Sequence, residues 1–445
     1  MKSTFFQTIL IIVFIAFAIF AALVFSGFIP IGGDEDKGPK GEVVIWGTLP
    51  ADGVNPSLDK INLQNQGLKV SYIEKDDDRF EQDLIEALAS QKGPDLIFFP
   101  ETFIVRHGDK LLPLGYNIIS ERDFKSSFVE EAELLLLPTG IIGVPFFIDP
   151  IILYYNRDTY NEVGFTEPVS KWIDFPSVVP KLSKLDKNNN VLRSGIPLGE
   201  YDNVLHAKEI LSLLMFQLGS PIVALQYEKQ EDGMLRQKLV ASMNRGTARL
   251  VNPGESALRF YTEFANPTKT TYSWNKTMPN SKDAFVSGRA AMYLGFSSEA
   301  GEIAAKNPLL NFDVAVVPQL TNDYAIRATY GKMYSLGVVK LTKNLEGAVY
   351  VATGLFGRDF GHEVGKSLFL APARRDALSL GTSSDAMTSI FYRSALIAKG
   401  FLDPSPKETA KIFRQSVSDI LSGKANPAEA AGNAHSLLSD VLQKD

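Results

Sequence analysis

The side chains best suited to chemistry are scattered along this sequence and form no recognisable catalytic motif. Its 51 acidic residues make chance pairs of carboxylates unavoidable, and position marks none of these pairs as an acid and a base. The chain has no cysteine, which excludes disulfides, thiolate metal sites and a cysteine nucleophile. The four histidines lack metal-binding spacing; they are His107, His206, His362 and His435.

Two short stretches come close to catalytic motifs and fail at a defining position. Gly295 to Glu299, GFSSE, has a glutamate where a nucleophile elbow requires its final glycine. Gly361 to Ser367, GHEVGKS, has three residues between its glycines, whereas a phosphate-binding loop needs four. We therefore predict a binding protein with no enzymatic activity, no metal and no cofactor.

Length and charge indicate a folded protein of more than one domain. At 445 residues the chain exceeds what a single hydrophobic core usually supports, so we expect two lobes or domains. A formal charge of −6 and a pI of about 5.5 provide no broad basic field. Nucleic acid is therefore not an expected partner.

A long apolar stretch opens the chain. No charged residue lies between Ser3 and Gly33, and a helix over Phe5 to Phe25 would span roughly 30 Å, the thickness of a bilayer core. Lys2 precedes this stretch and acidic residues follow it, which favours a cytoplasmic N-terminus. Two interpretations stay open, namely an uncleaved single-pass anchor over residues 1–33 and a cleaved signal peptide. In either case we expect a polar linker at 34–41 and a folded part outside the cytoplasm.

Strand and helix patterns alternate after the linker. Glu42 to Thr48, Leu68 to Glu74 and Asp95 to Phe99 have the composition of buried strands, and a helix is expected from residues 76–78 to about Gly93. Near-continuous apolar strands separated by a helix are typical of a parallel sheet covered on both faces. The sequence therefore predicts an α/β fold.

The stretch from Gly143 to Asp158, GVPFFIDPIILYYNRD, has a special role in this organisation. Two apolar and aromatic runs meet at Asp149-Pro150, where proline removes a backbone donor and biases the preceding residue toward extended geometry. We interpret the stretch as a strand that crosses between two bodies. Further along the chain we expect a loop over 328–334, followed by a strand from Ser335 to Val339.

The chain is expected to end in two packed helices. Ser405-Pro406 with Glu408, and Asn426-Pro427 with Glu429, each place an N-cap, a first-turn proline and a capping glutamate in register. Apolar residues at helical spacing follow both devices.

From Glu42 to the C-terminus the chain resembles the extracellular solute-binding proteins of ATP-driven importers, in the sugar-binding group that includes maltose-binding-like proteins. The resemblance is carried by Lys69-Val70, Pro94 to Leu96, Val144-Pro145 with Tyr155 to Asp158, Thr166 to Leu182, Ala284 to Met292 followed by Gly295, and Pro372 to Ala377. It implies a two-lobed periplasmic-binding-protein-like fold of type II, preceded here by one transmembrane helix. The hinge crossings would lie near 147–150, 317–320 and 370–385. Residues 42–147 with about 319–370 would form one lobe, and 151–316 with about 385–445 the other.

The resemblance also implies a site in the cleft between the lobes. In open α/β sheets ligands bind beyond the carboxyl ends of strands. Sugars present apolar ring faces and a rim of hydroxyls, which suit aromatic platforms combined with carboxylate, hydroxyl and amide groups. The expected ligand-binding residues are Trp46, Thr48, Glu101, Asp149, Trp274, Phe296, Ser297, Tyr330, Tyr334 and Arg375.

By the same resemblance we expect a monomer at the cell membrane that captures a small solute by hinge closure and delivers it to ABC permease subunits. Two departures keep the solute open. Phe296 stands where many relatives have tryptophan, and Gly331-Lys332-Met333 replaces the usual glycine-rich sequence. A peptide, a polyol or another small solute is the alternative to a sugar. A non-catalytic sensory ectodomain or surface adhesin is the alternative function for the same fold.

Overall fold

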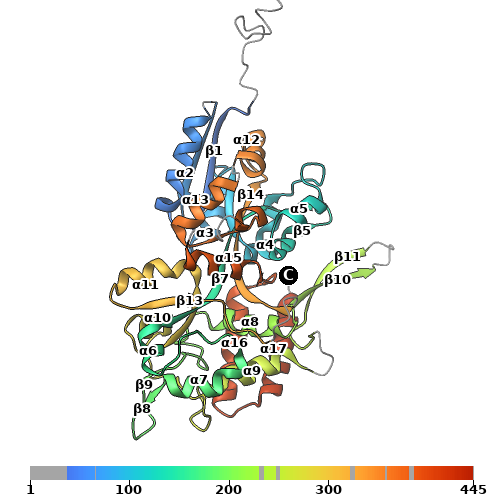
Figure 1. The fold of residues 1–445 in the computed structure, drawn as a ribbon. Helices are drawn as coiled ribbons and strands as arrows, with labels where there is room; N and C mark the ends of the chain where they lie inside the picture. The colour runs from blue at the N-terminus through green and yellow to red at the C-terminus, as the bar shows by residue number, and fades with distance from the viewer. Residues whose placement is uncertain are drawn as a thin grey trace, which may run out of the picture.

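The computed structural model describes residues 38–65, 67–229, 235–246, 251–320, 326–355, 358–379 and 385–443. The anchor expected at 1–33 lies outside these residues, as does the linker up to residue 37. Among the residues described, no helix combines the length and the apolar character that a membrane span requires. The described chain forms two bodies joined by long strands (Figure 1), here called lobe 1, which carries the chain start, and lobe 2.

Lobe 1 is built around a mixed sheet. Strands β1 (Gly41–Gly47), β2 (Leu68–Glu74) and β3 (Leu96–Pro100) are parallel, and β3 pairs antiparallel with β14 (Thr329–Val339). Helices α2 (Ala51–Gln64) and α3 (Phe80–Ala89) connect the parallel strands. The apolar side chains of β1 and β3 are buried except for the partly buried Val44, so the predicted covered parallel strands are confirmed within a mixed sheet.

Shorter elements complete lobe 1 beside this sheet. In chain order they are η1 (Glu101–Phe103), α4 (Ile104–His107), η2 (Gly108–Lys110), β4 (Leu111–Leu112), α5 (Glu121–Ser127), η3 (Glu130–Leu135), β5 (Leu136–Leu137), β6 (Gly140–Ile141), α12 (Leu345–Tyr350), η7 (Val351–Leu355), α13 (Arg358–Leu368), β15 (Ala371–Pro372) and α14 (Arg375–Leu378). Helix α15 (Ala386–Ala395) and β16 (Ala398–Lys399) follow at the junction of the lobes, where α15 packs on β7 and β16 pairs with β14.

Strand β7 (Val144–Asn156) crosses from lobe 1 to lobe 2, as the sequence predicted (Figure 1). Its first half pairs with β14 and β15, and its second half pairs with β12 (Met292–Phe296) and β13 (Phe312–Ala315). Pro150, which has no N–H to donate, lies opposite Gly331. The strand therefore belongs to the sheets of both lobes.

Strand β14 is longer than the sequence predicted. The loop expected over 328–334 is wrong, because residues from Thr329 onward pair with β16 and β7. Gly331 allows this close approach, since a Cβ there would stand 2.7 Å from Glu131 Oε2 and 2.8 Å from the Ala398 Cβ. Glycine and lysine are uncommon within strands, so the pattern at Gly331 and Lys332 did not indicate a strand, although both residues pair with β7.

Lobe 2 is mainly helical around the far half of β7. Its long helices α8 (Ala207–Gln217), α9 (Pro253–Glu263), α16 (Pro406–Leu421) and α17 (Pro427–Leu442) pack on one another, which confirms the two terminal helices. An unpredicted hairpin of β10 (Val223–Lys229) and β11 (Leu235–Ala241) projects beside them (Figure 1). The remaining elements are α6 (Arg157–Glu162), η4 (Trp172–Asp174), α7 (Phe175–Leu182), β8 (Lys184–Leu185), β9 (Val191–Arg193), α10 (Ser281–Val286), η5 (Ser297–Glu299) and α11 (Ala300–Lys306).

The two predicted helix caps differ in the structure. The Asn426 side chain accepts from the N–H groups of Ala428 and Glu429, both at 3.0 Å, and Glu429 completes the capping box. The Ser405 side chain makes no capping bond, so that prediction is wrong. Asp403 lies beside this helix start, where its Oδ1 accepts from the Ser405 N–H at 3.1 Å and from the Thr409 hydroxyl at 2.7 Å.

Because Asn426 caps its helix and Ser405 does not, alanine substitutions at the two positions should change the free energy of unfolding by different amounts. Asn426→Ala should lower the free energy of unfolding by about 1 kcal/mol, because two helix N–H groups lose their acceptor. Ser405→Ala should change it by less than about 0.5 kcal/mol, the range of ordinary surface substitutions. Urea unfolding of both variants checks this, and equal costs at the two positions would contradict it.

Candidate ligand-binding site

Asp149 stands at the middle of the crossing strand and connects it to lobe 2. It is 3 % exposed and accepts from the Ser297 hydroxyl at 2.9 Å, the Ser298 N–H at 3.0 Å and the Ser298 hydroxyl at 2.6 Å. Burial raises the pKa of Asp149 to about 6, although these hydrogen bonds act in the opposite direction. The predicted residues Asp149 and Ser297 are thus brought together and hold the loop after β12 against β7.

Glu101 follows β3 and is fully buried beside β14. Its carboxylate accepts from the Met333 N–H at 3.0 Å and from the Tyr330 hydroxyl at 3.2 Å. Burial raises the pKa of Glu101 to about 7. The predicted residues Glu101 and Tyr330 are therefore direct partners.

Glu131 of η3 lies beside Glu101 and was not predicted. A Cβ at Gly400 would stand 2.7 Å from Glu131 Oε1 and 3.3 Å from Glu101 Cγ, so the two side chains flank the same glycine. Both carboxyl oxygens of Glu131 are buried without a hydrogen-bond partner among the described residues. Burial, followed by the Glu101 charge, raises the pKa of Glu131 well above its usual value. Burial therefore favours the protonated form of these two neighbouring carboxyls.

Aromatic rings from lobe 2 lie next to this carboxyl pair. The Tyr330 ring is nearly parallel to the Phe216 ring, with centroids 6.3 Å apart, and the Phe296 ring meets Tyr330 edge-on at 6.3 Å. His206 packs edge-on against Phe296 at 4.6 Å and is bonded to Glu299. Phe296 remains partly exposed, and so offers an apolar face to a ligand.

His206 was missed by the sequence analysis. It precedes α8 with a backbone φ of 62°, a left-handed conformation that non-glycine residues rarely adopt. Single isolated histidines carry no sequence signal, so only the fold shows that this one contacts Phe296.

Lobe 1 contributes cationic side chains beside two of the predicted aromatic residues. Lys75 Nζ lies 3.8 Å from the centre of the Trp46 ring, and Lys332 Nζ lies 5.1 Å from the centre of the Tyr334 ring. Lys332 also pairs with Asp77 at 3.9 Å. Burial alone would lower the pKa of Lys332, but the acidic groups of Tyr334, Asp77 and Glu101 outweigh it and the pKa is raised. Lys332 is therefore a charged donor at neutral pH.

Of the other predicted residues at the strand ends, Thr48 is partly exposed and Trp46 is 9 % exposed. Tyr334 is also partly exposed, and Lys332, its neighbour two residues away, lies opposite Asp149 in the sheet. We call the predicted residues at this junction, together with Lys75, Glu131, His206 and Lys332, the junction cluster.

The structure does not bring Trp274 and Arg375 to the junction cluster. Trp274 is fully buried in lobe 2 and donates its indole N–H to Asn203 Oδ1 at 2.9 Å, so it packs the core beneath the loop before α8. Arg375 is exposed at the start of α14 and donates to the Phe128 carbonyl at 2.6 Å. Both side chains are already engaged in lobe-internal contacts.

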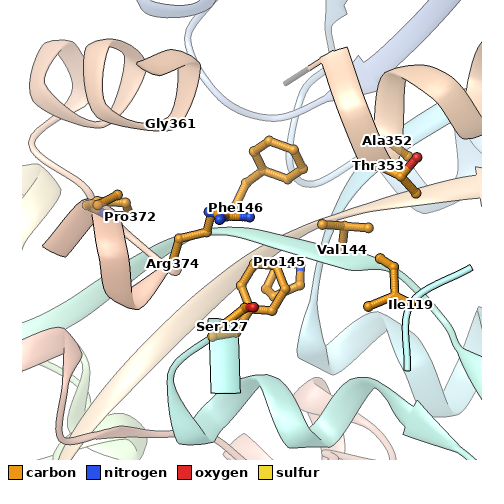
Figure 2. A pocket seen from close by; sticks show the side chains of 12 residues that line it. Ile119, Ser127, Val144, Pro145, Phe146, Ala352, Thr353, Gly361, Pro372 and Arg374 are labelled. Carbon is orange, nitrogen blue, oxygen red and sulfur yellow. The ribbon is translucent and has the colours of Figure 1, made fainter. Parts of the chain in front are cut away.

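Two cavities lie near these residues. A groove of about 530 Å³ opens at the junction between η3 and the end of α8, and Glu131, Phe216 and Gly400 contribute to its lining. A smaller cavity of about 190 Å³ lies in lobe 1 and is lined by Val144, Pro145 and Phe146 of β7 and by Arg374, which lies beside Phe146 (Figure 2). Only the groove adjoins the junction cluster. The described residues hold no group of three His, Cys, Asp or Glu side chains arranged for a metal ion.

Fold and site together define a two-lobed α/β binding protein with its polar and aromatic groups at the strand ends between the lobes. The family of bacterial extracellular solute-binding proteins matches residues 57–349, and the chain belongs to that family. This confirms the family resemblance drawn from the sequence, while the membrane anchor lies outside the described residues.

Individual relatives are distant in sequence and close in fold. The galactooligosaccharide-binding protein of Bacillus subtilis (strain 168) is 21 % identical over 405 residues, which cover 88 % of this chain and 87 % of the relative. The cyclic alpha-maltosyl-1,6-maltose binding protein of Arthrobacter globiformis superposes with a TM-score of 0.73 at 16 % identity, covering 91 % of this chain and 100 % of that one. The sugar-binding protein MalE of Xanthomonas citri gives a TM-score of 0.70 at 18 % identity, over 91 % and 98 % of the two chains. These structures support the two-lobed periplasmic-binding-protein-like fold.

Proposed function

We propose that this protein binds a carbohydrate outside the cytoplasm, in the junction cluster between its lobes, and delivers it to the permease of an ABC importer. The observation that carries the proposal is the link between two segments: Ser297, which follows the partly exposed Phe296, is bonded to Asp149, and Asp149 lies opposite Lys332 of β14. Lys332 in turn pairs with Asp77 of lobe 1. The relatives named for galactooligosaccharide and for cyclic maltosyl-maltose support a carbohydrate over a peptide or a polyol.

Each group has a role that suits a sugar. The face of Phe296 packs against the C–H groups of a pyranose ring, which are apolar. Lys332 and Asp77 supply a donor and an acceptor for hydroxyl groups on the ring edge. His206 fixes the orientation of Phe296, because the two rings are in edge-to-face contact.

The two lobes would close about the segments that cross between them. A solute favours the closed form only by the contacts that it makes there in excess of those in the open form. We place the hinge at the crossings near 147–150, 317–320 and 370–385, with residues 42–147 and about 319–370 on one side and 151–316 and about 385–445 on the other. A monomer is sufficient for this mechanism, and an N-terminal anchor would keep the binder near its permease.

Calorimetric titration of the protein with mono- and oligosaccharides, polyols, peptides and amino acids tests the proposal. We expect a carbohydrate to bind and, at 100 times its Kd, to stabilise the fold by about 2.7 kcal/mol. Phe296→Ala should weaken that binding roughly tenfold, the scale of one lost aromatic contact.

Tyr350→Ala is the matched control, because Tyr350 is an exposed aromatic residue of α12 in lobe 1, away from the junction cluster. It should leave the affinity unchanged. Binding of a peptide alone, or no ligand across the panel by a folded protein, would overturn the carbohydrate proposal and favour the sensory or adhesive alternative.

A further inference from the structure

One end of lobe 1 combines exposed leucines with lysines. The starts of β1, β2 and β3 meet there with the end of β14 and the start of α12 (Figure 1). Leu63 and Leu341 are 81 % and 62 % exposed at this end, and Leu345 is also exposed. The lysines of the same end are Lys40, Lys69, Lys92, Lys110, Lys340 and Lys343. We call these nine residues the basic end.

Long-range hydrogen bonds hold the loops of the basic end together. The Asn344 side chain donates to the carbonyls of Lys40 at 3.0 Å and Glu42 at 3.2 Å, which joins the start of α12 to the start of β1. The Lys340 N–H donates to the Lys110 carbonyl at 2.9 Å, and the Lys343 N–H donates to Asp95 at 3.1 Å. The lysines are therefore displayed from one fixed surface.

The charge of the basic end is opposite to that of the whole chain. Glu42, Asp95, Asp109 and Glu346 are the acidic residues at or beside it, and two of them pair with lysines, Glu42 with Lys69 at 3.9 Å and Asp109 with Lys110 at 3.0 Å. Six lysines against four acids leave a net positive surface, on a chain with a formal charge of −6. Exposed leucines among lysines suit the boundary between anionic headgroups and acyl chains.

We propose that the basic end of lobe 1 docks on an anionic lipid surface. The described chain begins at Gly38, within this same end, and 37 residues precede it. The leucines would enter the headgroup region while the lysines contact lipid phosphates, each lysine strengthening binding by roughly fivefold. Docking of this kind would orient lobe 1 toward the membrane whether or not the junction cluster holds a solute.

Site-specific labelling of the full chain tests the proposal, because the protein has no native cysteine. Leu341→Cys carries a fluorophore at the basic end, and Leu309→Cys carries it on lobe 2, where Leu309 is 92 % exposed. Vesicles of phosphatidylcholine, with or without phosphatidylglycerol, contain a lipid-attached quencher. We expect at least threefold stronger quenching at position 341 than at 309 with phosphatidylglycerol, and loss of the difference at high salt.

Lysine-to-glutamate variants provide a second test of the proposal. Lys340→Glu with Lys343→Glu should abolish the additional quenching at 341, while Lys187→Glu with Lys407→Glu, exposed lysines of lobe 2, should preserve it. Because quenching at 309 reports attachment through any other part of the chain, the difference between the two labels isolates the basic end. Equal quenching at both labels, or quenching that does not depend on phosphatidylglycerol, would overturn the proposal. So would a dimer of the chain that covers position 341 and keeps the quencher away from it.

Discussion

Raising the pH from about 5 to about 7.5 should lower the free energy of unfolding of this protein by on the order of 3 kcal/mol through the buried Glu101–Glu131 pair. Burial raises the pKa of Glu101 to about 7, whereas the pKa of a glutamate in the unfolded chain is about 4.5. Between these values the folded state retains a proton that the unfolded state releases. The contribution of this proton to the free energy of unfolding is therefore fully present below about pH 4.5, and it is lost as the pH rises toward 7. Asp149, with a pKa raised to about 6, contributes in the same direction.

Urea unfolding at several pH values between 5 and 7.5 measures this slope. The acidic group whose pKa is lowered most inside lobe 1, Glu81 at about 2, titrates below the window and does not interfere. Glu101→Gln should remove much of the slope, because the amide oxygen still accepts from the Met333 N–H and no proton is exchanged. Glu121→Gln, an exposed glutamate on α5, should leave the slope intact. A free energy of unfolding that is constant or rises across the window would refute the raised pKa values of this pair.

Trp274→Ala should cost about 3–5 kcal/mol of unfolding free energy. The indole is fully buried, and its N–H donates to Asn203, which in turn donates to the carbonyls of Asn275 and Met278. Truncation leaves a cavity and removes a hydrogen bond from the loop that leads to His206. Chemical denaturation measures the loss, and a reduced signal for solute binding in this variant would follow from partial unfolding.

Trp274→Phe separates packing from ligand contact. It retains most of the ring volume and loses the bond to Asn203, so we expect a smaller cost of about 1–2 kcal/mol and an unchanged affinity for the solute. A Trp274→Ala variant as stable as the wild type, with lost affinity, would place the indole in the binding site instead of the core.

Several features of this protein follow from local sequence alone. Continuous apolar runs identified the buried strands, and Asp149-Pro150 within such a run marked the strand that crosses between the lobes. Asn426 with Glu429 predicted a complete capping box. These features depend on neighbours within a few residues, which is the range over which periodicity and capping act.

Other features required contacts between distant parts of the chain. The loop expected before Ser335 proved to be strand because its partners, β7 and β16, come from residues 144–156 and 398–399. The Ser405 side chain makes no capping bond, and its backbone N–H donates to Asp403, which also pairs with Lys208 of another helix at 2.9 Å. Pattern alone does not show which partner a residue finds across the fold.

The candidate site also combines features that local sequence predicts with features that depend on distant contacts. The sequence by itself determined the α/β class, the crossing strand and a set of aromatic and polar residues at strand ends, because burial and chain direction leave a local pattern. Only the tertiary structure decided which of these side chains meet. It placed Phe296 beside His206 and Tyr330, buried Trp274 in the core, and brought Glu131 against Glu101 across 30 residues of chain. The physical reason is that the periodic pattern of apolar residues along the sequence indicates which side chains are buried. The neighbours of a side chain and its protonation depend instead on elements that are distant in the sequence.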